Sequence, residues 1–184
     1  MKINKKILSL VLSLVLSLVI GISVVGCSSP SSPDDSSKKD AKTEQKKDEK
    51  KEYKFGDTIE MKDYDEGTYK LTFEGVRSTD ERNEFAEIEA KKVVFVDFNY
   101  ENVDCKEAVF VTEGIEYQVA DGDGNVLQTY PVDDSTRMQQ ETTAGTKSKG
   151  TTAFAITSDS NAVKIIVKDK VNNKVMGEIN ATLE

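Results

Sequence analysis

The chain has 184 residues and a net charge of −8, with 33 acidic residues, 25 lysines and arginines, and neither histidine nor tryptophan. Without histidine, the chain lacks the most common general base and the most common transition-metal ligand. An acidic surface repels phosphate backbones, so we exclude nucleic acid as a partner. The length allows one ordinary domain once the unusual N-terminal segments are set aside.

The chain begins with a short basic segment and a long apolar run, which is the layout of a secretory signal. Lys2, Lys5 and Lys6 precede residues 7–25, which contain only Ile, Leu, Val, Ser and Gly. As a helix this run would be about 28 Å long, close to the ~30 Å thickness of a bilayer core. A permanent transmembrane helix is therefore the alternative interpretation.

The residues that end this run favour a cleaved signal. They are Val24, Val25, Gly26 and Cys27, and they resemble the lipobox of bacterial lipoproteins. The resemblance implies that the Cys27 thiol receives a diacylglycerol and that residues 1–26 are removed by cleavage between Gly26 and Cys27. It also implies a protein anchored in the cell membrane on its extracytoplasmic side. Two acyl chains hold a protein stably, whereas one binds only marginally.

Residues 27–52 are expected to form a disordered linker. After Cys27 the stretch contains seven lysines, seven acidic residues and, as its only apolar side chain, Ala41. Such a sequence buries too little surface to offset the entropy lost by an ordered chain. The linker is therefore predicted to hold the domain that follows, residues 53–184, clear of the membrane.

From residue 53 onward, short apolar alternations are separated by turn residues, which predicts strands rather than helices. The strongest strand signal is residues 92–100, where Val94, Val96, Phe98 and Tyr100 alternate with other residues and Asp97 and Asn99 face away. Further strands are predicted at 55–61, 68–76, 151–156, 162–168 and 175–183. Residues 115–130 are predicted to form a β-hairpin around the turn DGDGN, and Asn172 and Asn173 to supply left-handed positions in the last turn.

The connections between these segments are too short for parallel crossovers, so the strands should pair antiparallel. Each apolar sheet face must also be covered by another layer. The sequence therefore predicts an all-β domain, an antiparallel β-sandwich of about seven strands.

The order of several segments carries a second resemblance. These segments are FGDTIEM, YKLTFEGVRSTDE, KKVVFVDFNYEN, DGDGN, TAGTKSKGTTAFAI and AVKIIVKD. They resemble the immunoglobulin-like domain of unknown function found on lipoproteins of Gram-positive bacteria, which is related to a secreted immunoprotective antigen. The resemblance implies an immunoglobulin-like sandwich in an extracellular place, and it supplies no catalytic residue.

One connection is crowded with acidic residues. They are Asp80, Glu81, Glu84, Glu87 and Glu89. They are candidate contacts for a cation or a basic peptide, and the alternative is a solvated loop. Ser78 and Glu81 fit a capping box, so this connection can form either an open loop or one short helix with Phe85 and Ile88 on one face.

The DGDGN turn has the first ligand spacings of a calcium loop. The candidate ligands are Asp121, Asp123 and Asn125. Val126 replaces the glycine of such loops, however, and Val132 replaces the bidentate glutamate. A tight turn that needs Gly122 and Gly124 at positive φ explains the same residues, so no metal site is predicted and calcium remains the alternative.

Cys105 lies beside acidic residues and has no histidine to activate it, so a structural role is expected. Tyr53, Tyr64 and Tyr130 lie near predicted strand ends. They are expected to close the sandwich, and the alternative is that they stack on sugars or on a partner.

No recognisable acid, base or nucleophile constellation is present in residues 53–184, so we predict a protein that is not an enzyme. We expect a membrane-anchored interaction module whose excess negative charge favours a cationic protein or peptide partner. Two alternatives remain open: a small envelope enzyme that uses carboxylates on a glycan, and a spacer or accessory domain of an envelope assembly. No cofactor is expected beyond the fatty acyl groups on Cys27.

Overall fold

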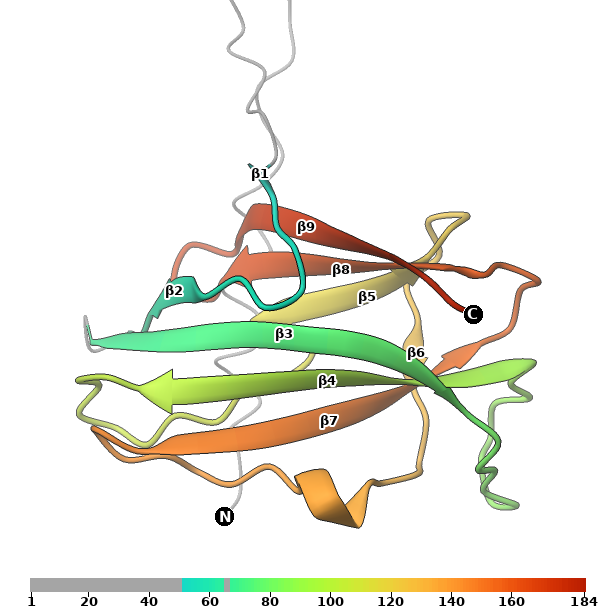
Figure 1. The fold of residues 1–184 in the computed structure, drawn as a ribbon, viewed down its shortest axis with the longest axis horizontal. Helices are drawn as coiled ribbons and strands as arrows, with labels where there is room; N and C mark the ends of the chain where they lie inside the picture. Colours follow the sequence, from blue (N-terminus) through green and yellow to red (C-terminus); the bar gives the residue numbers. More distant parts are fainter. Residues whose placement is uncertain (1–50, 65–66) are drawn as a thin grey trace, which may run out of the picture. The chain divides into compact units, whose positions relative to one another are not determined.

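The computed structural model describes residues 51–64 and 67–184, which contain nine strands and one short 3₁₀ helix (Figure 1). The elements are β1 (Lys51–Glu52), β2 (Ile59–Lys62), β3 (Thr68–Thr79), β4 (Lys92–Asn102), β5 (Tyr117–Asp121), β6 (Gln128–Thr129), η1 (Ser135–Arg137), β7 (Lys147–Ile156), β8 (Ala162–Asp169) and β9 (Lys174–Thr182). The predicted signal peptide, Cys27 and most of the predicted linker lie outside the described residues. No helix in the described part is long and apolar enough to cross a membrane.

The strands form two sheets that pack face to face. One sheet has the order β1-β9-β8-β5 and the other the order β2-β3-β4-β7-β6. Adjacent strands are antiparallel in every pair except β1 with β9. The predicted all-β sandwich is therefore confirmed, and seven of its strands are four residues or longer.

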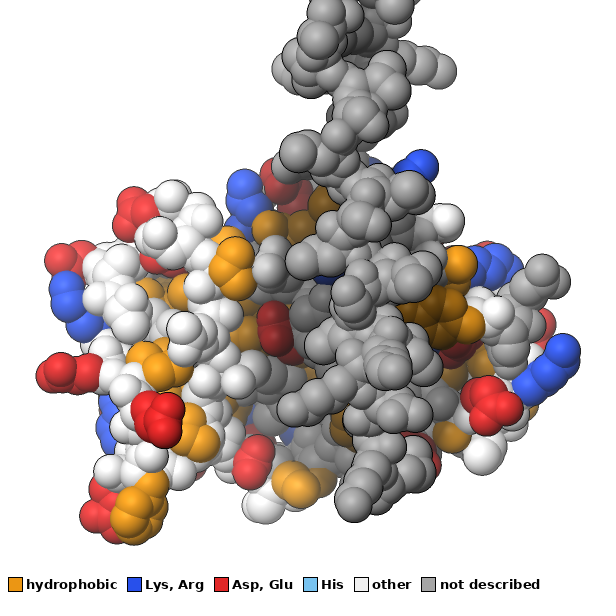
Figure 2. Space-filling view, turned by 180° about the vertical axis from the view of Figure 1, so that it is seen from behind, with side chains coloured by type: hydrophobic (Ala, Val, Ile, Leu, Met, Phe, Trp, Pro, Cys, Tyr) orange, Lys and Arg blue, Asp and Glu red, His pale blue; other side chains and the backbone are white. Residues whose placement is uncertain are grey.

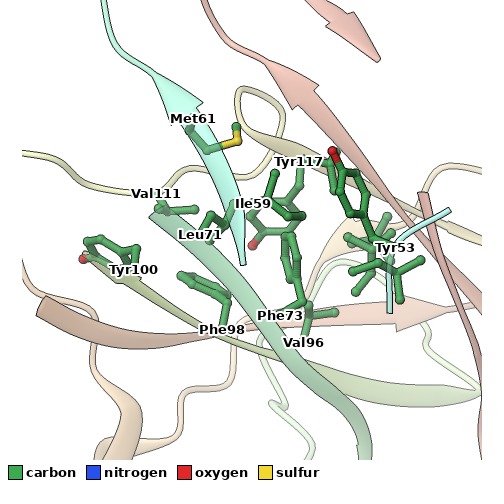
Figure 3. Packing of buried hydrophobic residues seen from close by; sticks show 14 of the residues in the cluster. Tyr53, Ile59, Met61, Leu71, Phe73, Val96, Phe98, Tyr100, Val111 and Tyr117 are labelled. Atoms are coloured by element: carbon green, nitrogen blue, oxygen red, sulfur yellow. The ribbon is translucent and has the colours of Figure 1, made fainter. Parts of the chain in front are cut away.

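The core between the sheets follows the period-2 pattern of the strands. On β3 the buried residues are Tyr69, Leu71 and Phe73, each 0% exposed, as the alternation predicts. Figure 3 shows Phe73, Phe98 and Tyr117 packed together between the two sheets. The ring centroid of Tyr117 lies 5.3 Å from that of Phe73 and 5.8 Å from that of Phe98, within the range of favourable aromatic pairs.

The first half of β4 is buried on both faces, which the sequence analysis did not predict. Val94, Val96 and Phe98 point into the main core as expected. On the opposite face, Val93 and Phe95 belong to a second apolar cluster that also contains Tyr130, Ala153 and Ala155. Ala86, Ile88 and Ala90 pack against this second cluster, so the connection after β3 covers the outer face of the sheet.

The predicted hairpin over residues 115–130 is confirmed only beside the turn, where Ala120 forms an antiparallel bridge with Val126, and not over its full length. β5 pairs with β8 in one sheet, whereas β6 pairs with β7 in the other. The turn between them joins the two layers, and the two segments are linked by the hydrogen bond from Leu127 N to Val119 O, at 2.8 Å, and by one isolated bridge. An alternating pattern around a glycine-rich turn does not specify which sheet the returning strand joins.

The folded domain starts before residue 53. Lys51 and Glu52, placed in the linker by the sequence analysis, form β1 in parallel with Gly177 and Glu178. A Cβ atom at Gly177 would collide with the Lys51 carbonyl and the Tyr53 ring, so glycine allows this close approach. In the β8–β9 turn only one predicted asparagine is left-handed: Asn173, with φ of 52°.

Candidate functional site

Three connections lie at one end of the sandwich, on the right in Figure 1. We call residues 80–91, 121–127 and 157–161 the acidic end. They contain eight aspartates and glutamates but only one lysine and one arginine. In Figure 2, acidic side chains are spread over this end of the domain, on the left of that view. The end therefore has a strong local excess of negative charge.

The five acidic residues of the first connection are all exposed. They are Asp80, Glu81, Glu84, Glu87 and Glu89. None of these carboxylates forms an ion pair with another residue in the described part of the chain. The ion pair at this end instead joins Lys91 Nζ to Asp159 Oδ1, at 2.9 Å. The carboxylates of the first connection are thus free to meet charges on another molecule.

This connection contains no helix, so the structure has the open loop and not the alternative in which Ser78 and Glu81 form a capping box. Ser78 belongs to β3, where it pairs with Val94. Glu81 N instead donates to Thr79 Oγ1 at 3.1 Å, and Arg82 donates to the Thr79 carbonyl oxygen. Because Ser78 is paired in the sheet, it cannot cap a helix. The local hydrogen bonds to Thr79 instead hold the chain in an open turn.

The middle of the connection is attached to the sandwich through Asn83. Its backbone N donates to the Tyr130 hydroxyl at 3.1 Å, and its side-chain Nδ2 donates to the Pro131 carbonyl oxygen at 2.7 Å. The Asn83 Oδ1 atom accepts from Phe85 N at 2.9 Å. These contacts, with the packing of Ile88 and its neighbours, fix the loop beneath its tip.

Phe85 lies at this tip with 83% of its surface exposed, which is the largest value among the exposed hydrophobic residues of the described part. Figure 2 shows hydrophobic and acidic side chains together at the lower left corner, where this connection lies. A large exposed ring costs hydration free energy unless a partner covers it. The spacing of Phe85 and Ile88 is also compatible with one face of a helix, so the sequence alone does not indicate this exposure.

The candidate calcium ligands form a closed turn. Asp121 is 3% exposed, and its Oδ1 accepts from Asp123 N at 3.0 Å and from Asn125 N at 2.8 Å. Its Oδ2 accepts from Ser158 Oγ at 2.8 Å. Desolvation alone raises the pKa of Asp121, but the hydrogen bonds from Asn125, Ser158 and Asp123 outweigh it and hold the pKa below its ordinary value.

In this turn both oxygens of the Asp121 carboxylate accept hydrogen bonds from protein donors. No group of three metal-binding side chains occurs among residues 51–64 and 67–184. Gly124 has a φ of 88°, as the turn interpretation predicts. Gly122 has no positive φ, contrary to expectation, and a Cβ atom there would lie 2.7 Å from Ser160 Oγ.

The structure brings the two sequence-predicted sites together. Glu87 and Ile88 line one side of a hollow of about 310 Å³, and Asp121 and Asn125 line another. Val126, also in the lining, is 54% exposed. The hollow therefore joins apolar surface to carboxylate oxygens at the acidic end.

The other residues singled out in the sequence lie elsewhere. Cys105 is 1% exposed, and its backbone N donates to Asn102 Oδ1 at 2.9 Å, which agrees with a structural role. Tyr53 and Tyr130 are both buried, at 7% and 6% exposure, but only Tyr53 belongs to the main core, whereas Tyr130 belongs to the second apolar cluster on the outer face of the sheet. Tyr64 is 70% exposed, and its hydroxyl donates to the Lys170 carbonyl oxygen at 3.0 Å.

A buried charged cluster, which the sequence analysis missed, lies outside the acidic end. Lys170 Nζ is 2.8 Å from Asp63 Oδ2 and 3.5 Å from Glu116 Oε1. The Tyr69 hydroxyl donates to Glu116 Oε1 at 3.3 Å, and Thr112 N donates to Glu116 Oε2 at 2.9 Å. We call Asp63, Tyr69, Glu116 and Lys170 the Lys170 cluster. Its members come from three connections and one strand, so no local pattern marks it.

Comparison with models of protein families and with curated proteins gave no match. Among solved structures, the chain is similar to MPT63, a secreted protein of Mycobacterium tuberculosis, with a TM-score of 0.51 and 13% identity over 72% of this chain and 97% of MPT63. It is also similar to the YjhA protein of Bacillus subtilis, with a TM-score of 0.50 and 12% identity over 72% of this chain and 99% of that one. A candidate lipoprotein of Staphylococcus aureus gives a TM-score of 0.49 and 8% identity, over 68% of this chain and 93% of that one. At these identities the shared property is the β-sandwich fold.

Proposed function

We propose that this protein is a lipoprotein held at the cell membrane through Cys27, and that its sandwich is a non-catalytic module that binds a basic protein or peptide surface through the acidic end. The single observation that carries the binding proposal is Phe85. It is 83% exposed on a connection that hydrogen bonds hold in place, between carboxylates that have no ion-pair partner in the described residues.

The chemistry of the acidic end suits a basic partner with an apolar pocket. Exposed carboxylates of one sign attract a cationic surface and accelerate its approach. Aromatic side chains commonly supply the central binding energy of a protein interface. Because Asn83 already orders the loop, little conformational entropy should be lost when Phe85 inserts.

The location part of the proposal rests on the lipobox-like residues Val24 to Cys27 and on the kinds of protein that share the fold. MPT63 is described as secreted, and the Staphylococcus aureus protein as a candidate lipoprotein. We expect fatty-acid labelling of the intact chain in cells, and we expect Cys27→Ser to abolish the label while Cys105→Ser retains it. Label on the Cys27→Ser protein would contradict the anchor.

The binding proposal is tested by capture of partners from solubilised envelopes with the full chain, at low salt and at ~0.5 M salt, where exposed charges are screened within a few ångströms. A basic partner should be retained at low salt and lost on charge screening. Glu84→Gln combined with Glu87→Gln should weaken retention, whereas the exposed Glu141→Gln, outside the acidic end, is the matched control. Retention of the partner that is unchanged at ~0.5 M salt and unchanged in the Glu84→Gln, Glu87→Gln variant would refute the proposal. Turnover of an envelope glycan by the chain would also refute it.

A further inference from the structure

A second hollow lies on the outer face of the sheet that contains β3, β4 and β7, and it has the opposite charge to the acidic end. Its volume is about 430 Å³. Its lining includes Thr58, Lys70, Thr72, Glu101, Lys147 and Lys149. Three lysines and one carboxylate therefore line this hollow in a chain whose net charge is −8.

The strand register explains why these lysines gather. Glu101 on β4 lies directly across from Lys70 on β3 and from Lys147 on β7. Two residues along, Asn99 lies between Thr72 and Lys149 in the same way. Side chains two residues apart on a strand point to the same face, so the two rows form one polar surface.

Glu101 neutralises only part of this positive charge. Its Oε2 atom is 3.2 Å from Lys147 Nζ and 4.0 Å from Lys70 Nζ. Lys149 forms no ion pair with another described residue. The Lys70 and Lys147 side chains are 45% and 71% exposed, so their ammonium groups are accessible to a ligand.

We propose that this hollow binds a linear anionic polymer, through phosphate or carboxylate groups that contact Lys147, Lys149 and Lys70 in turn. The Lys70 and Lys147 Nζ atoms converge on Glu101 Oε2, at 4.0 and 3.2 Å, and Lys149 follows Lys147 along β7 at a residue spacing of about 7 Å, so the lining presents two separate cationic positions. This spacing fits successive charges of a polymer better than one small ion. The Thr72 hydroxyl donates to Thr58 Oγ1 at 3.5 Å, which leaves the Thr58 hydroxyl in the lining to donate a further hydrogen bond to a ligand.

The test is a titration of the full chain in detergent with short-chain polyphosphate at low salt, with poly-glutamate of similar charge as a second arm. Lys147→Gln and Lys149→Gln should each weaken polyphosphate binding about two- to fivefold, as expected for exposed charge contacts. Glu101→Gln should strengthen it by a similar factor, because it removes the only carboxylate of the lining. If both polymers bind, the hollow recognises anionic polymers in general. If only polyphosphate binds, the hollow recognises phosphate groups.

Controls separate this proposal from the others. Lys174→Gln, an exposed lysine outside the hollow, and Phe85→Ala at the acidic end should both leave polyphosphate binding unchanged. Thermal unfolding of each variant shows that it is folded. An unchanged affinity in the Lys149→Gln variant, a weaker affinity in the Glu101→Gln variant, or no binding of either polymer would each overturn the proposal.

Discussion

In the Lys170 cluster, the side chains of Lys170, Asp63 and Glu116 are 11%, 10% and 2% exposed, and each has a partner of opposite charge. At the acidic end, by contrast, the carboxylates of the first connection are exposed and have no ion-pair partner in the described residues. Buried charges are tolerated only when paired, because removing them from water is costly. Exposed charges are hydrated and contribute little to stability. The Lys170 cluster therefore stabilises the fold, whereas the acidic end is available for recognition.

Removal of the buried cation should change the stability of the domain most. Lys170→Met should lower the free energy of unfolding by about 3–5 kcal/mol, because it leaves Asp63 and Glu116 buried without a compensating charge. Urea unfolding at neutral pH measures the change. Lys174→Met, an exposed lysine four residues along the chain, is the control. A loss no larger than that of the control would show that the cluster does not stabilise the sandwich.

Alkaline pH should destabilise the domain through the same cluster. Burial, with the charge of Glu116 next in importance, raises the pKa of the Tyr69 phenol above its ordinary value of 10.0. Burial likewise raises the pKa of Tyr117. The unfolded chain therefore releases phenol protons at a pH where the folded chain retains them, and the free energy of unfolding falls as the pH rises above about 10.

Deprotonation of Lys170 should also lower the free energy of unfolding at alkaline pH. Desolvation lowers the pKa of Lys170, but hydrogen bonding to Asp63 and the charge of Glu116 outweigh it, so the pKa lies above 10.5. Its stabilising charge is present below that value and is lost as the pH rises through the pKa of the folded state. The free energy of unfolding, measured from pH 9 to 11.5, should fall as the pH rises. The fall per pH unit should be smaller in the Tyr69→Phe variant. An identical slope in that variant would contradict the assignment.

The smallest effect on stability is expected at the acidic end. Replacing Glu84, Glu87 and Glu89 together by glutamine should leave the urea midpoint within experimental error of the original, because these side chains are exposed and unpaired. The same variant should lose most of its affinity for a basic partner. A clear drop in the midpoint would mean that these carboxylates have a structural role.

The difference between the two regions also explains what the sequence could predict. The buried face of β3 and one face of β4 follow from period-2 alternation, which is local information. The Lys170 cluster joins Asp63 to a residue 107 positions away, so it depends on the final topology. Nothing near either residue in the sequence indicates the other.

Two differences between the local sequence pattern and the structure have a common physical cause. The capping-box pattern at Ser78 and the alternation on both sides of the DGDGN turn are locally compatible with a helix and a hairpin. In the folded chain, Ser78 pairs with Val94, and β6 joins the sheet opposite β5. Long-range strand pairing replaced the structure favoured by the local pattern in both places.

Asp97 shows a third limit of the sequence. It was predicted to face away from the main core, and it does. Its carboxylate nevertheless accepts from Arg77 Nε at 2.8 Å and from Thr151 Oγ1 at 2.6 Å. The alternation pattern gives the direction of a side chain but not its hydrogen-bond partners.

Site-specific photo-crosslinking in intact cells tests whether Phe85 at the acidic end is the contact point for a basic partner. A photoreactive phenylalanine analogue would replace Phe85 in one strain and Phe110, which is 46% exposed outside the acidic end, in another. We predict a discrete crosslink from position 85 to a basic envelope protein, lost when Glu84 and Glu87 are changed to glutamine, and none to that protein from position 110. The absence of a crosslink at position 85, or the same product from both positions, would contradict the claim.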